Sequence, residues 1–360
     1  GSSCEGMEID GPPIDKVAGA SCASAGSANA TDAAANDDGS AGPADERVAL
    51  FPRGVRTLTV GDGDFVFSEA LANAHHPLST GKLVATNLDT EEEEVAKYAS
   101  AGDRLARLRA AGAEVVCGVD ATRLGEGPLA GYAPFDRIAF NFPLLPVGRI
   151  LLNNARGSDV HLENRALLVA FLRSAPALLA KRGMVVIASK DCFPYSWWRI
   201  EAMSLWTGGE LSLTAVLPWK STEYPTLYDG PCNVNRDAAV KPTDAVVFVF
   251  SRSGEGDAFP LSRWCRGFVG AHPTAPPVGP HCCPVCRPGG LSFHSAKELA
   301  AHQAGRIHRK RVGLEQRWQA RGASPGDARG PCEDEEKQEA AEEAIAGSRS
   351  RSPCEKRHAS

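Results

Sequence analysis

The sequence predicts an α/β fold built on a largely parallel sheet, and three observations support this. An apolar run with β-strand character, Thr57-Leu-Thr-Val60, stops at a Gly-x-Gly turn and leads at once into an amphipathic stretch. Further short apolar runs recur between segments with helical periodicity. Several of these runs end in an acidic or polar residue, where open α/β sheets carry their ligands. Strands that alternate with helices indicate parallel pairing through right-handed crossovers.

The first strand and its turn form the most informative segment. After Thr57–Val60 comes Gly61-Asp-Gly-Asp64, followed by a helical pattern of apolar residues at Phe67, Ala70, Leu71 and Ala74. A strand, a tight glycine turn and a helix N-terminus hold a nucleotide in many α/β proteins. The motif alone is weak, because the chain contains 36 glycines and a turn without a ligand gives the same match.

Two further strands end in carboxylates. Asp89 closes the run 83–89, and two ionised oxygens suit the two hydroxyls of a ribose. Asp120 closes the run 114–120 and can accept from an exocyclic amine such as that of adenine. Between them the segment 91–111 predicts one helix behind an acidic first turn, with apolar positions at Val95, Tyr98, Leu105 and Leu108. The predicted cofactor-binding residues are therefore Gly61, Asp62, Gly63, Asp64, Asp89 and Asp120.

The fourth predicted strand, 135–143, ends in Asn141-Phe-Pro143. A dehydrogenase would share the glycine turn and the first acid, so this tip distinguishes the possible chemistries. A side-chain amide at the reactive end of a cofactor suits holding a planar nitrogen base edge-on for alkyl transfer. The alternative is a proline that simply ends a strand, with Phe142 in the core.

The remaining elements complete a Rossmann-like sheet with helices on both faces. The segment 162–179 predicts a helix that Pro176 kinks or restarts. A fifth strand at 183–190, a helix near 197–206 and a late pair of strands at 211–217 and 245–250 follow.

Composition limits the class of protein. The chain has 360 residues, a net charge of -5 and 43% hydrophobic residues, so any basic surface must be local. Eleven scattered cysteines, an odd number, indicate a reducing compartment. No apolar run approaches a membrane span or a signal-peptide core, so we expect no membrane partner. Because the chain opens with Gly1 rather than Met, we expect a fragment or a processed chain.

Five regions are predicted from composition and pattern. Residues 1–50 form a disordered segment poor in bulky apolar side chains. Residues 51–252 form the α/β domain, and 253–280 a Gly/Pro/Ser-rich linker. Residues 281–313 hold a Cys/His cluster, and 314–360 a charged, largely disordered tail.

The ordered motifs of the α/β domain resemble the eukaryotic family of 25S ribosomal RNA uridine-N3 methyltransferases. The resemblance runs through about 51–252 and rests on 61–68, 85–89, 118–122, 135–143, 164–168, Lys190 with 194–198, and Tyr224-Pro225. It implies a class I S-adenosylmethionine-dependent fold, methylation of N3 of a uridine in large-subunit ribosomal RNA, and a nuclear, nucleolar location. One departure is that His and Gly tend to follow Asn-Phe-Pro in the family, whereas Leu144-Leu-Pro-Val-Gly148 follows here.

Candidate reaction residues lie at the ends of the fourth and fifth strands. Asn141, Phe142, Pro143 and Lys190 are the predicted catalytic residues, and Lys190 can stabilise charge that develops on uridine O2 or O4. A surface or phosphate-binding lysine is the alternative. Tyr195 and Trp198 are predicted to stack on a flipped base, although such a cluster is also typical of a core.

The cysteine and histidine spacing predicts a zinc site. The ligands are the pair Cys283-Pro-Val-Cys286 with His302 and His308 downstream, a Cys2His2 set. Residues 295–298 predict a helix-starting capping box, and Gly305 lets the helix loosen so that both histidines reach one ion. The pattern resembles matrin/U1-type fingers, which favour RNA. A metal-free loop is the alternative, and Cys282 could replace Cys283.

A basic stretch extends the finger helix through Arg306, Arg309, Lys310, Arg311, Arg317 and Arg321, with Trp318 among them. Such a helix can follow RNA phosphates, and Arg309 and Lys310 are predicted RNA contacts. A solvated charged face is the simpler interpretation.

Two functional hypotheses follow. The first is an S-adenosylmethionine-dependent RNA methyltransferase whose zinc finger adds affinity for ribosomal or other structured RNA. The second is a non-catalytic RNA-binding protein that retains a methyltransferase-like scaffold, an alternative kept open by the altered Leu144-Leu145 segment. Methylation of another RNA or of a small nucleobase-like substrate is a third option.

Overall fold

The computed structural model describes residues 48–79, 81–145, 159–192, 194–228, 230, 232–233, 236–239, 242, 245–254, 280–283, 285–286 and 291–321. The predicted disordered segment 1–50 lies outside these residues except at its last three positions. Most of the linker 253–280 and the tail beyond residue 321 also lie outside them.

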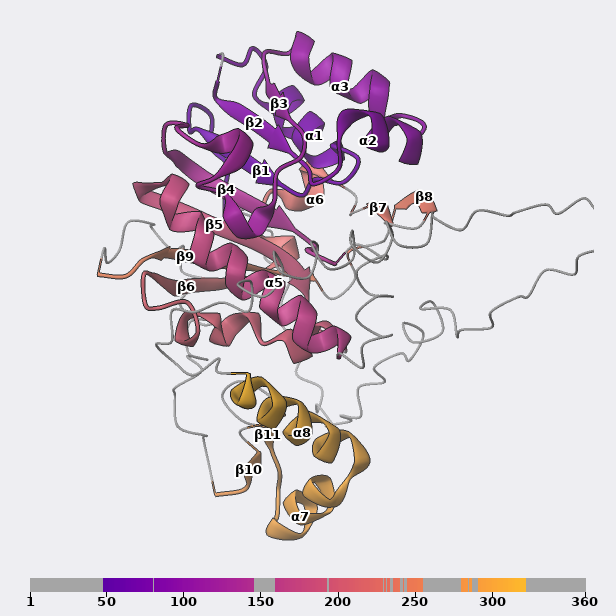
Figure 1. Ribbon diagram of the computed structural model, residues 1–360. Helices are drawn as coiled ribbons and strands as arrows, with labels where there is room; N and C mark the ends of the chain where they lie inside the picture. Colours follow the sequence, from indigo (N-terminus) through magenta and orange to yellow (C-terminus); the bar gives the residue numbers. More distant parts are fainter. Residues whose placement is uncertain are drawn as a thin grey trace, which may run out of the picture. The chain divides into compact units, whose positions relative to one another are not determined.

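One seven-stranded sheet organises the α/β domain, in the order β3-β2-β1-β4-β5-β9-β6 (Figure 1). Five strands run parallel to one another: β1 (Thr57–Val60), β2 (Leu83–Thr86), β3 (Glu114–Val116), β4 (Phe135–Asn141) and β5 (Leu179–Lys190). The late strands β6 (Leu211–Pro218) and β9 (Ala245–Arg252) pair with each other antiparallel, and β9 is also antiparallel to β5. The predicted Rossmann-like sheet with a closing pair of strands is therefore confirmed.

Helices cover both faces of this sheet. The α-helices are α1 (Val66–Ala74), α2 (Glu91–Lys97), α3 (Ala101–Ala110), α5 (Val160–Ser174), α6 (Tyr224–Leu227), α7 (Ala296–Ala304) and α8 (Arg306–Ala320). The short 3-10 helices are η2 (Ala121–Arg123), η3 (Gly127–Leu129), η4 (Ala175–Leu178), η5 (Tyr195–Trp198), η6 (Ile200–Leu205) and η7 (Trp219–Ser221). Two small hairpins, β7 (Cys232–Asn233) with β8 (Arg236–Ala239) and β10 (Cys282–Cys283) with β11 (Leu291–Ser292), lie outside the main sheet.

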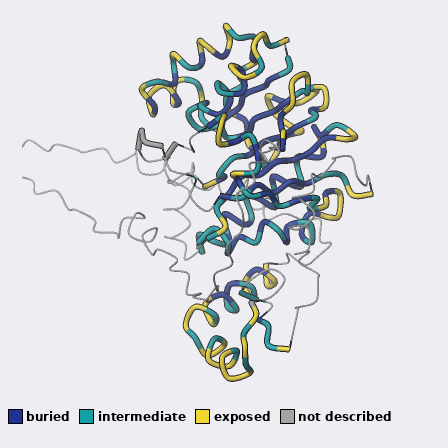
Figure 2. The backbone as a smooth tube through the Cα atoms, turned by 180° about the vertical axis from the view of Figure 1, so that it is seen from behind, coloured by how far each residue is buried: buried dark blue, intermediate teal, exposed yellow. Residues whose placement is uncertain are grey.

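Two apolar cores sandwich the strands, because successive side chains of a strand point to opposite faces. On β4, Ile138 and Phe140 join the core that contains α5, whereas Ala139 joins the core that contains α1 and α3. The strands are accordingly buried while the outer sides of the helices are exposed (Figure 2). No helix among the described residues is long and apolar enough to cross a membrane.

The single helix predicted over 91–111 is wrong, because the segment forms α2 and α3. Tyr98 adopts an extended backbone (φ -126°, ψ 117°) between them, and its side chain turns into the protein. A single continuous helix would place Val95 on the buried face, whereas Val95 is 44% exposed.

Three other boundaries differ from the predictions. Pro176 ends the regular helix, because α5 stops at Ser174 and η4 contains the proline in its first turn. The predicted helix near 197–206 is a pair of 3-10 helices, η5 and η6, separated by Arg199 in a left-handed conformation. The helix α8 runs beyond the predicted boundary at residue 313, because Leu314 and Trp318 are buried in the same core as α5.

Candidate functional site

A cavity of about 370 Å³ opens at the carboxyl ends of β1, β2 and β4, within the usual range for small-molecule sites. Every predicted cofactor-binding residue lines it, as do the three residues of the Asn-Phe-Pro tip. Its lining comprises Gly61, Asp62, Gly63, Asp64, Asn87, Leu88, Asp89, Lys97, Tyr98, Val119, Asp120, Ala121, Phe140, Asn141, Phe142, Pro143, Leu144, Leu167 and Tyr228. The structure thus brings residues from four strand ends to one site.

The glycine turn requires glycine at its first position. Gly61 has φ +59°, and a Cβ there would lie 2.7 Å from the Phe140 ring. Phe65 also adopts a left-handed conformation (φ 60°) and buries its side chain directly before α1. The main chain of the turn therefore approaches the cavity closely while its only large side chain points into the core.

The two carboxylates of this turn are engaged within the protein. Asp62 accepts hydrogen bonds from the Ser68 N–H at 2.7 Å and the Ser68 hydroxyl at 2.5 Å. Burial, with the nearby charge of Asp64 adding to it, raises the pKa of Asp62 to about 6. Asp64 forms an ion pair with Arg104 at 3.3 Å. These side chains fix the turn, so the turn presents mainly its backbone to a ligand.

The acids that end the next two strands remain at the cavity wall. Asp89 forms an ion pair with Lys97, and both side chains line the cavity. Asp120 caps η2, because its Oδ1 accepts from the N–H of Thr122 at 2.8 Å and from its hydroxyl at 2.7 Å. A ribose at Asp89 would share that carboxylate with Lys97, whereas Asp120 keeps its second oxygen for a ligand.

The sequence does not predict the buried amide–carboxyl pair formed by Asn87 and Glu94 near Asp89. Asn87 lines the cavity and donates to Glu94 Oε2 at 2.8 Å. Glu94 is fully buried, and this burial, together with the charge of Asp89, raises its pKa to about 8. No local signal identifies Glu94, since it is one of four consecutive glutamates in the first turn of α2.

Phe142 of the Asn-Phe-Pro tip packs against the core and also lies at the cavity wall. Phe142 has a left-handed backbone (φ 48°), and its N–H donates to the Ala188 carbonyl at 2.7 Å. Its ring packs near Trp219 and Tyr228, with centroid distances of 5.6 and 6.4 Å. Phe142 therefore contacts the core and also lines the cavity.

Asn141 is held by a residue distant in sequence. The Tyr224 hydroxyl donates to Asn141 Oδ1 at 2.7 Å. Tyr224 is completely buried, with its ring stacked on Phe67 at 5.3 Å and on Trp219 at 4.6 Å. Tyr224 is part of the family resemblance, but the sequence gives no sign that its partner is Asn141.

The altered segment after Pro143 is anchored as well. The Leu145 N–H donates to Asn164 Oδ1 at 3.0 Å, and Asn164 Nδ2 donates to the Val160 carbonyl at 2.8 Å. Leu144 is 38% exposed and lines the cavity. The segment therefore presents an apolar side chain at the site.

The other predicted reaction and substrate residues do not line the cavity. Lys190 Nζ is 5.9 Å from the centroid of the half-buried Tyr195 ring. Trp198 is buried and packs edge-on against Tyr195 at 5.1 Å, so it supports that ring and does not offer its own for stacking. Arg309 and Lys310 are exposed on α8, and Lys310 Nζ lies 5.6 Å from the Trp197 ring.

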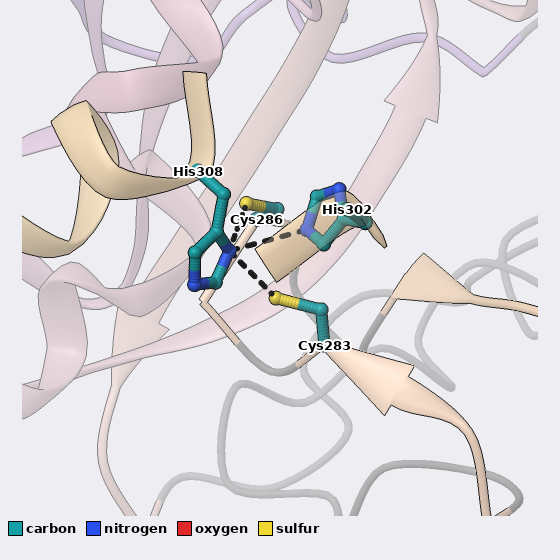
Figure 3. Close-up of side chains that lie close together, drawn as sticks. All are labelled: Cys283, Cys286, His302 and His308. Atoms are coloured by element: carbon teal, nitrogen blue, oxygen red, sulfur yellow. Dashed lines mark hydrogen bonds between the residues drawn. The ribbon is translucent and has the colours of Figure 1, made fainter. Parts of the chain in front are cut away.

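The structure brings the four predicted metal ligands together (Figure 3). Their ligand atoms all lie within 4.8 Å of one another. His308 Nδ1 is 3.4 Å from each sulfur, of Cys283 and of Cys286, and 3.2 Å from His302 Nε2. A tetrahedral zinc site places its ligand atoms roughly 3.3–3.8 Å apart. The donor set and these distances fit zinc.

The local structure explains how histidines six residues apart reach one point. The helix breaks at Gly305, whose extended backbone (ψ 149°) separates α7 from α8, and a Cβ there would lie 2.9 Å from the His302 carbonyl oxygen. Ser295 caps α7 as predicted. The capping box is incomplete, because the Glu298 carboxylate accepts from the His294 N–H at 3.0 Å. Cys282 is not part of the cluster.

The helix α8 is packed against the α/β domain. Arg165, fully buried in α5, donates to both carboxylate oxygens of Glu315 at 3.0 and 2.8 Å and to the Trp197 carbonyl at 2.6 Å. Arg311 donates to the carbonyls of Cys286 at 2.9 Å and Ser196 at 3.0 Å. One arginine therefore connects the metal-binding turn with η5.

This packing divides the predicted basic surface. Arg317 forms an ion pair with Asp159 at 2.5 Å, and Arg321 with Glu163 at 2.7 Å. Arg311 is buried, whereas Arg317 and Arg321 stay exposed while they pair with acids of the α/β domain. Among the described residues of α8, the exposed cations without an ion pair to that domain are Arg306, Arg309 and Lys310.

Comparison with known proteins identifies the family of this chain. Residues 58–229 match a family model described as BMT5-like, rRNA (uridine-N3-)-methyltransferase. An uncharacterized protein of Arabidopsis thaliana is 31% identical over 170 residues, which cover 47% of this chain and 78% of that protein. The heavy metal-associated isoprenylated plant protein 41 of the same species is 36% identical over 149 residues, 41% of this chain. The chain spans only 27% of the length of that relative.

Two solved structures are similar at low identity. TrmN from Thermus thermophilus is 18% identical with a TM-score of 0.34, over 56% of this chain and 44% of that chain. A TehB-like SAM-dependent methyltransferase from Corynebacterium glutamicum is 17% identical with a TM-score of 0.34, over 56% of this chain and 83% of that chain.

Proposed function

Because the chain belongs to the BMT5-like family of rRNA (uridine-N3-)-methyltransferases, we propose that it methylates N3 of a uridine in large-subunit ribosomal RNA with S-adenosylmethionine as the methyl donor. The observation that carries the proposal is the convergence on one cavity of the glycine turn, two strand-end carboxylates and the Asn-Phe-Pro tip. The first two suit an adenosyl group, and the third suits a planar base.

The residues of the cavity divide the binding of the two substrates. The backbone of Gly61–Asp64 suits the close approach of the donor, Asp89 suits the ribose hydroxyls, and Asp120 suits the adenine amine. The tip at Asn141 and the exposed side of Leu144 then face the acceptor base. This division places the donor against β1–β3 and the base against β4.

The chemistry needs positioning more than acid–base catalysis. Bound S-adenosylmethionine supplies an electrophilic methyl group, and its carbon–sulfur bond breaks with the electron pair left on sulfur as the N3–carbon bond forms. The N3 proton passes to solvent water. The contribution of the protein is to hold the base in line and to exclude competing orientations. Since Lys190 lies outside the cavity lining, we assign it to RNA binding beside Tyr195.

We also propose that zinc occupies the Cys2His2 cluster and that the exposed basic residues of α8 contact RNA phosphates. Ligand distances support the first part, and the exposed Arg306, Arg309 and Lys310 support the second. The lysines Lys310 and Lys190 lie against residues of the same 3-10 helix, η5. A large-subunit rRNA substrate further predicts a nucleolar location.

A non-catalytic RNA-binding scaffold is the second candidate, and Leu144 at the cavity favours it. Titration calorimetry with S-adenosylmethionine separates the two. We expect binding by the intact protein, a loss of affinity of at least tenfold in Asp89→Asn, and unchanged affinity in Asp103→Asn, an exposed acid on α3. An intact protein that does not bind S-adenosylmethionine would refute the enzyme proposal.

The substrate needs a second measurement. Mass spectrometry of nucleosides from the ribosomal RNA of cells lacking the protein should show reduced 3-methyluridine, restored by the wild-type chain but not by Asp89→Asn. Unchanged 3-methyluridine together with intact donor binding would direct the search to a different RNA.

A further inference from the structure

We propose that Tyr224 sets the base specificity of the site by orienting the Asn141 amide, so that its N–H groups face the base. The site then accepts a base whose reacting nitrogen is flanked by carbonyl oxygens and rejects one that presents an amine there. This inference rests on the proposed function, because it names what the acceptor side of that same cavity recognises.

The geometry fixes which end of the amide faces the ligand. Tyr224 donates to Asn141 Oδ1 at 2.7 Å from a completely buried position. A buried tyrosine hydroxyl needs an acceptor, and among the described residues no other acceptor takes its proton. Turning the amide over would leave that buried proton unpaired. The Asn141 oxygen therefore stays on Tyr224.

The other end of the amide remains available for a ligand. Asn141 lines the cavity, and within the described part of the chain its Nδ2 makes no hydrogen bond. The side-chain amide carries two N–H donors at this atom. The cavity therefore meets a hydrogen-bond donor at the tip of β4.

The turn that carries Tyr224 is itself fixed. The Glu223 carboxylate accepts from the N–H groups of Leu50 at 2.7 Å and Phe51 at 2.6 Å. The Phe51 ring packs edge-on against Tyr224 at 5.7 Å, and Arg137 donates to the Leu50 carbonyl at 2.6 Å. Because α6 is only four residues long, these contacts from residues 50–51 keep the hydroxyl in place.

A donor at this point matches uridine. N3 of uridine lies between the O2 and O4 carbonyls, and negative charge develops on both oxygens as the N3 proton leaves to water. A fixed N–H aimed at either oxygen stabilises that charge. Adenosine presents an exocyclic amine and no carbonyl beside its ring nitrogen, whereas cytidine keeps a carbonyl on one side and an amine on the other. In both bases the amine would place a donor against the Asn141 donors.

Tyr224→Phe tests the proposal, because it removes the hydroxyl and keeps the ring. We expect kcat on a uridine-containing RNA to fall roughly tenfold, less than the roughly hundredfold loss expected for Asn141→Ala. Affinity for S-adenosylmethionine should stay within twofold. Tyr132→Phe is the matched control, because it removes a surface hydroxyl that donates to Glu114 on β3, and it should keep wild-type kcat.

An RNA that contains 5-fluorouridine distinguishes a loss of Asn141 orientation from a general loss of activity. In RNA containing 5-fluorouridine, fluorine withdraws electrons and makes N3 more acidic, so the reaction depends less on the donor. The loss in Tyr224→Phe should therefore shrink several-fold on this RNA. Equal losses on both RNAs, a parallel loss of donor binding, or wild-type kcat in Tyr224→Phe would each overturn the proposal.

Different results would overturn this specificity proposal and the proposed function. Wild-type transfer to N1 of guanosine, which lies between a carbonyl and an amine, would refute both the uridine assignment and the inference. Transfer to the amine of cytidine or adenosine would overturn the inference. If the wild type methylates none of these nucleosides, its affinities for uridine and cytidine are compared in the presence of S-adenosylhomocysteine. The proposal requires that the wild type prefers uridine and that Tyr224→Phe abolishes this preference.

Discussion

The two halves of the cavity are built differently. In the donor half, three carboxylates are held by near neighbours in sequence: Asp62 by Ser68 six residues away, Asp89 by Lys97 eight away, and Asp120 by Thr122 two away. The exception is Asp64, which pairs with Arg104, 40 residues away. The acceptor half depends on a distant partner, because Asn141 is held by Tyr224 across 83 residues. Outside the cavity, η5 is likewise joined to α8 through Arg311, 115 residues from Ser196.

This difference teaches which parts of the site are independent of the rest of the chain. The donor half depends on the first three strands with α1 and α3. The proposed RNA-binding surface at η5 and α8, outside the cavity, needs the Cys/His cluster to be in place, because Arg311 of α8 donates both to Cys286 and to Ser196. Three perturbations test this separation.

Removing the metal should have the largest effect on stability, and it should leave the donor half intact. Metal binding contributes on the order of 10 kcal/mol to the folding of such units. We therefore expect a chelator to unfold α7 and α8, expose Leu314 and Trp318, and lower the melting temperature by several degrees. Circular dichroism and tryptophan fluorescence measure this, with restoration by added zinc as the control. A parallel loss of S-adenosylmethionine binding would break the separation.

Removing the Arg165–Glu315 ion pair between α5 and α8 should have an intermediate effect on stability. Glu315→Ala leaves the fully buried Arg165 without its partner carboxylate, and we expect a loss of about 3 kcal/mol in the free energy of unfolding. Gln316→Ala, an exposed neighbour, should change stability by less than about 0.5 kcal/mol. Urea denaturation compares the two, and similar values would mean that this pair does not fasten the helix.

The third perturbation is at Glu94 in the donor half, and its effect on stability depends on pH. Its pKa is raised from 4.5 to about 8, so the native state holds the proton more tightly than the unfolded chain. Its contribution to stability is therefore present at low pH and falls as the pH rises from about 4.5 to about 8. Glu94→Gln should flatten this part of the stability–pH curve.

Glu92→Gln, which changes an exposed neighbour of Glu94, is the matched control and should keep the wild-type slope of stability against pH. Thermal melts between pH 4.5 and 9 give the curves. An unchanged slope in Glu94→Gln would show that this carboxyl is ionised throughout.

Much of the fold followed from local pattern. The strands of the main sheet, the glycine turn and the four metal ligands were predicted because each depends on periodicity, turn chemistry or ligand spacing within a short window. The failures share a cause. Residues 91–111 form two helices because Tyr98 turns inward, and Arg311 is buried because α8 packs on the α/β domain.

The sequence by itself determined the order of strands and helices, the position of the donor-binding turn and the composition of the metal site. Only the tertiary structure decided that Tyr224 holds the Asn141 oxygen, that Glu94 is buried beside exposed acids, and that α8 is fixed to α5. Hydrogen-bond partners 83 or 150 residues apart leave no local periodicity, so they become visible only when the folded chain brings them together.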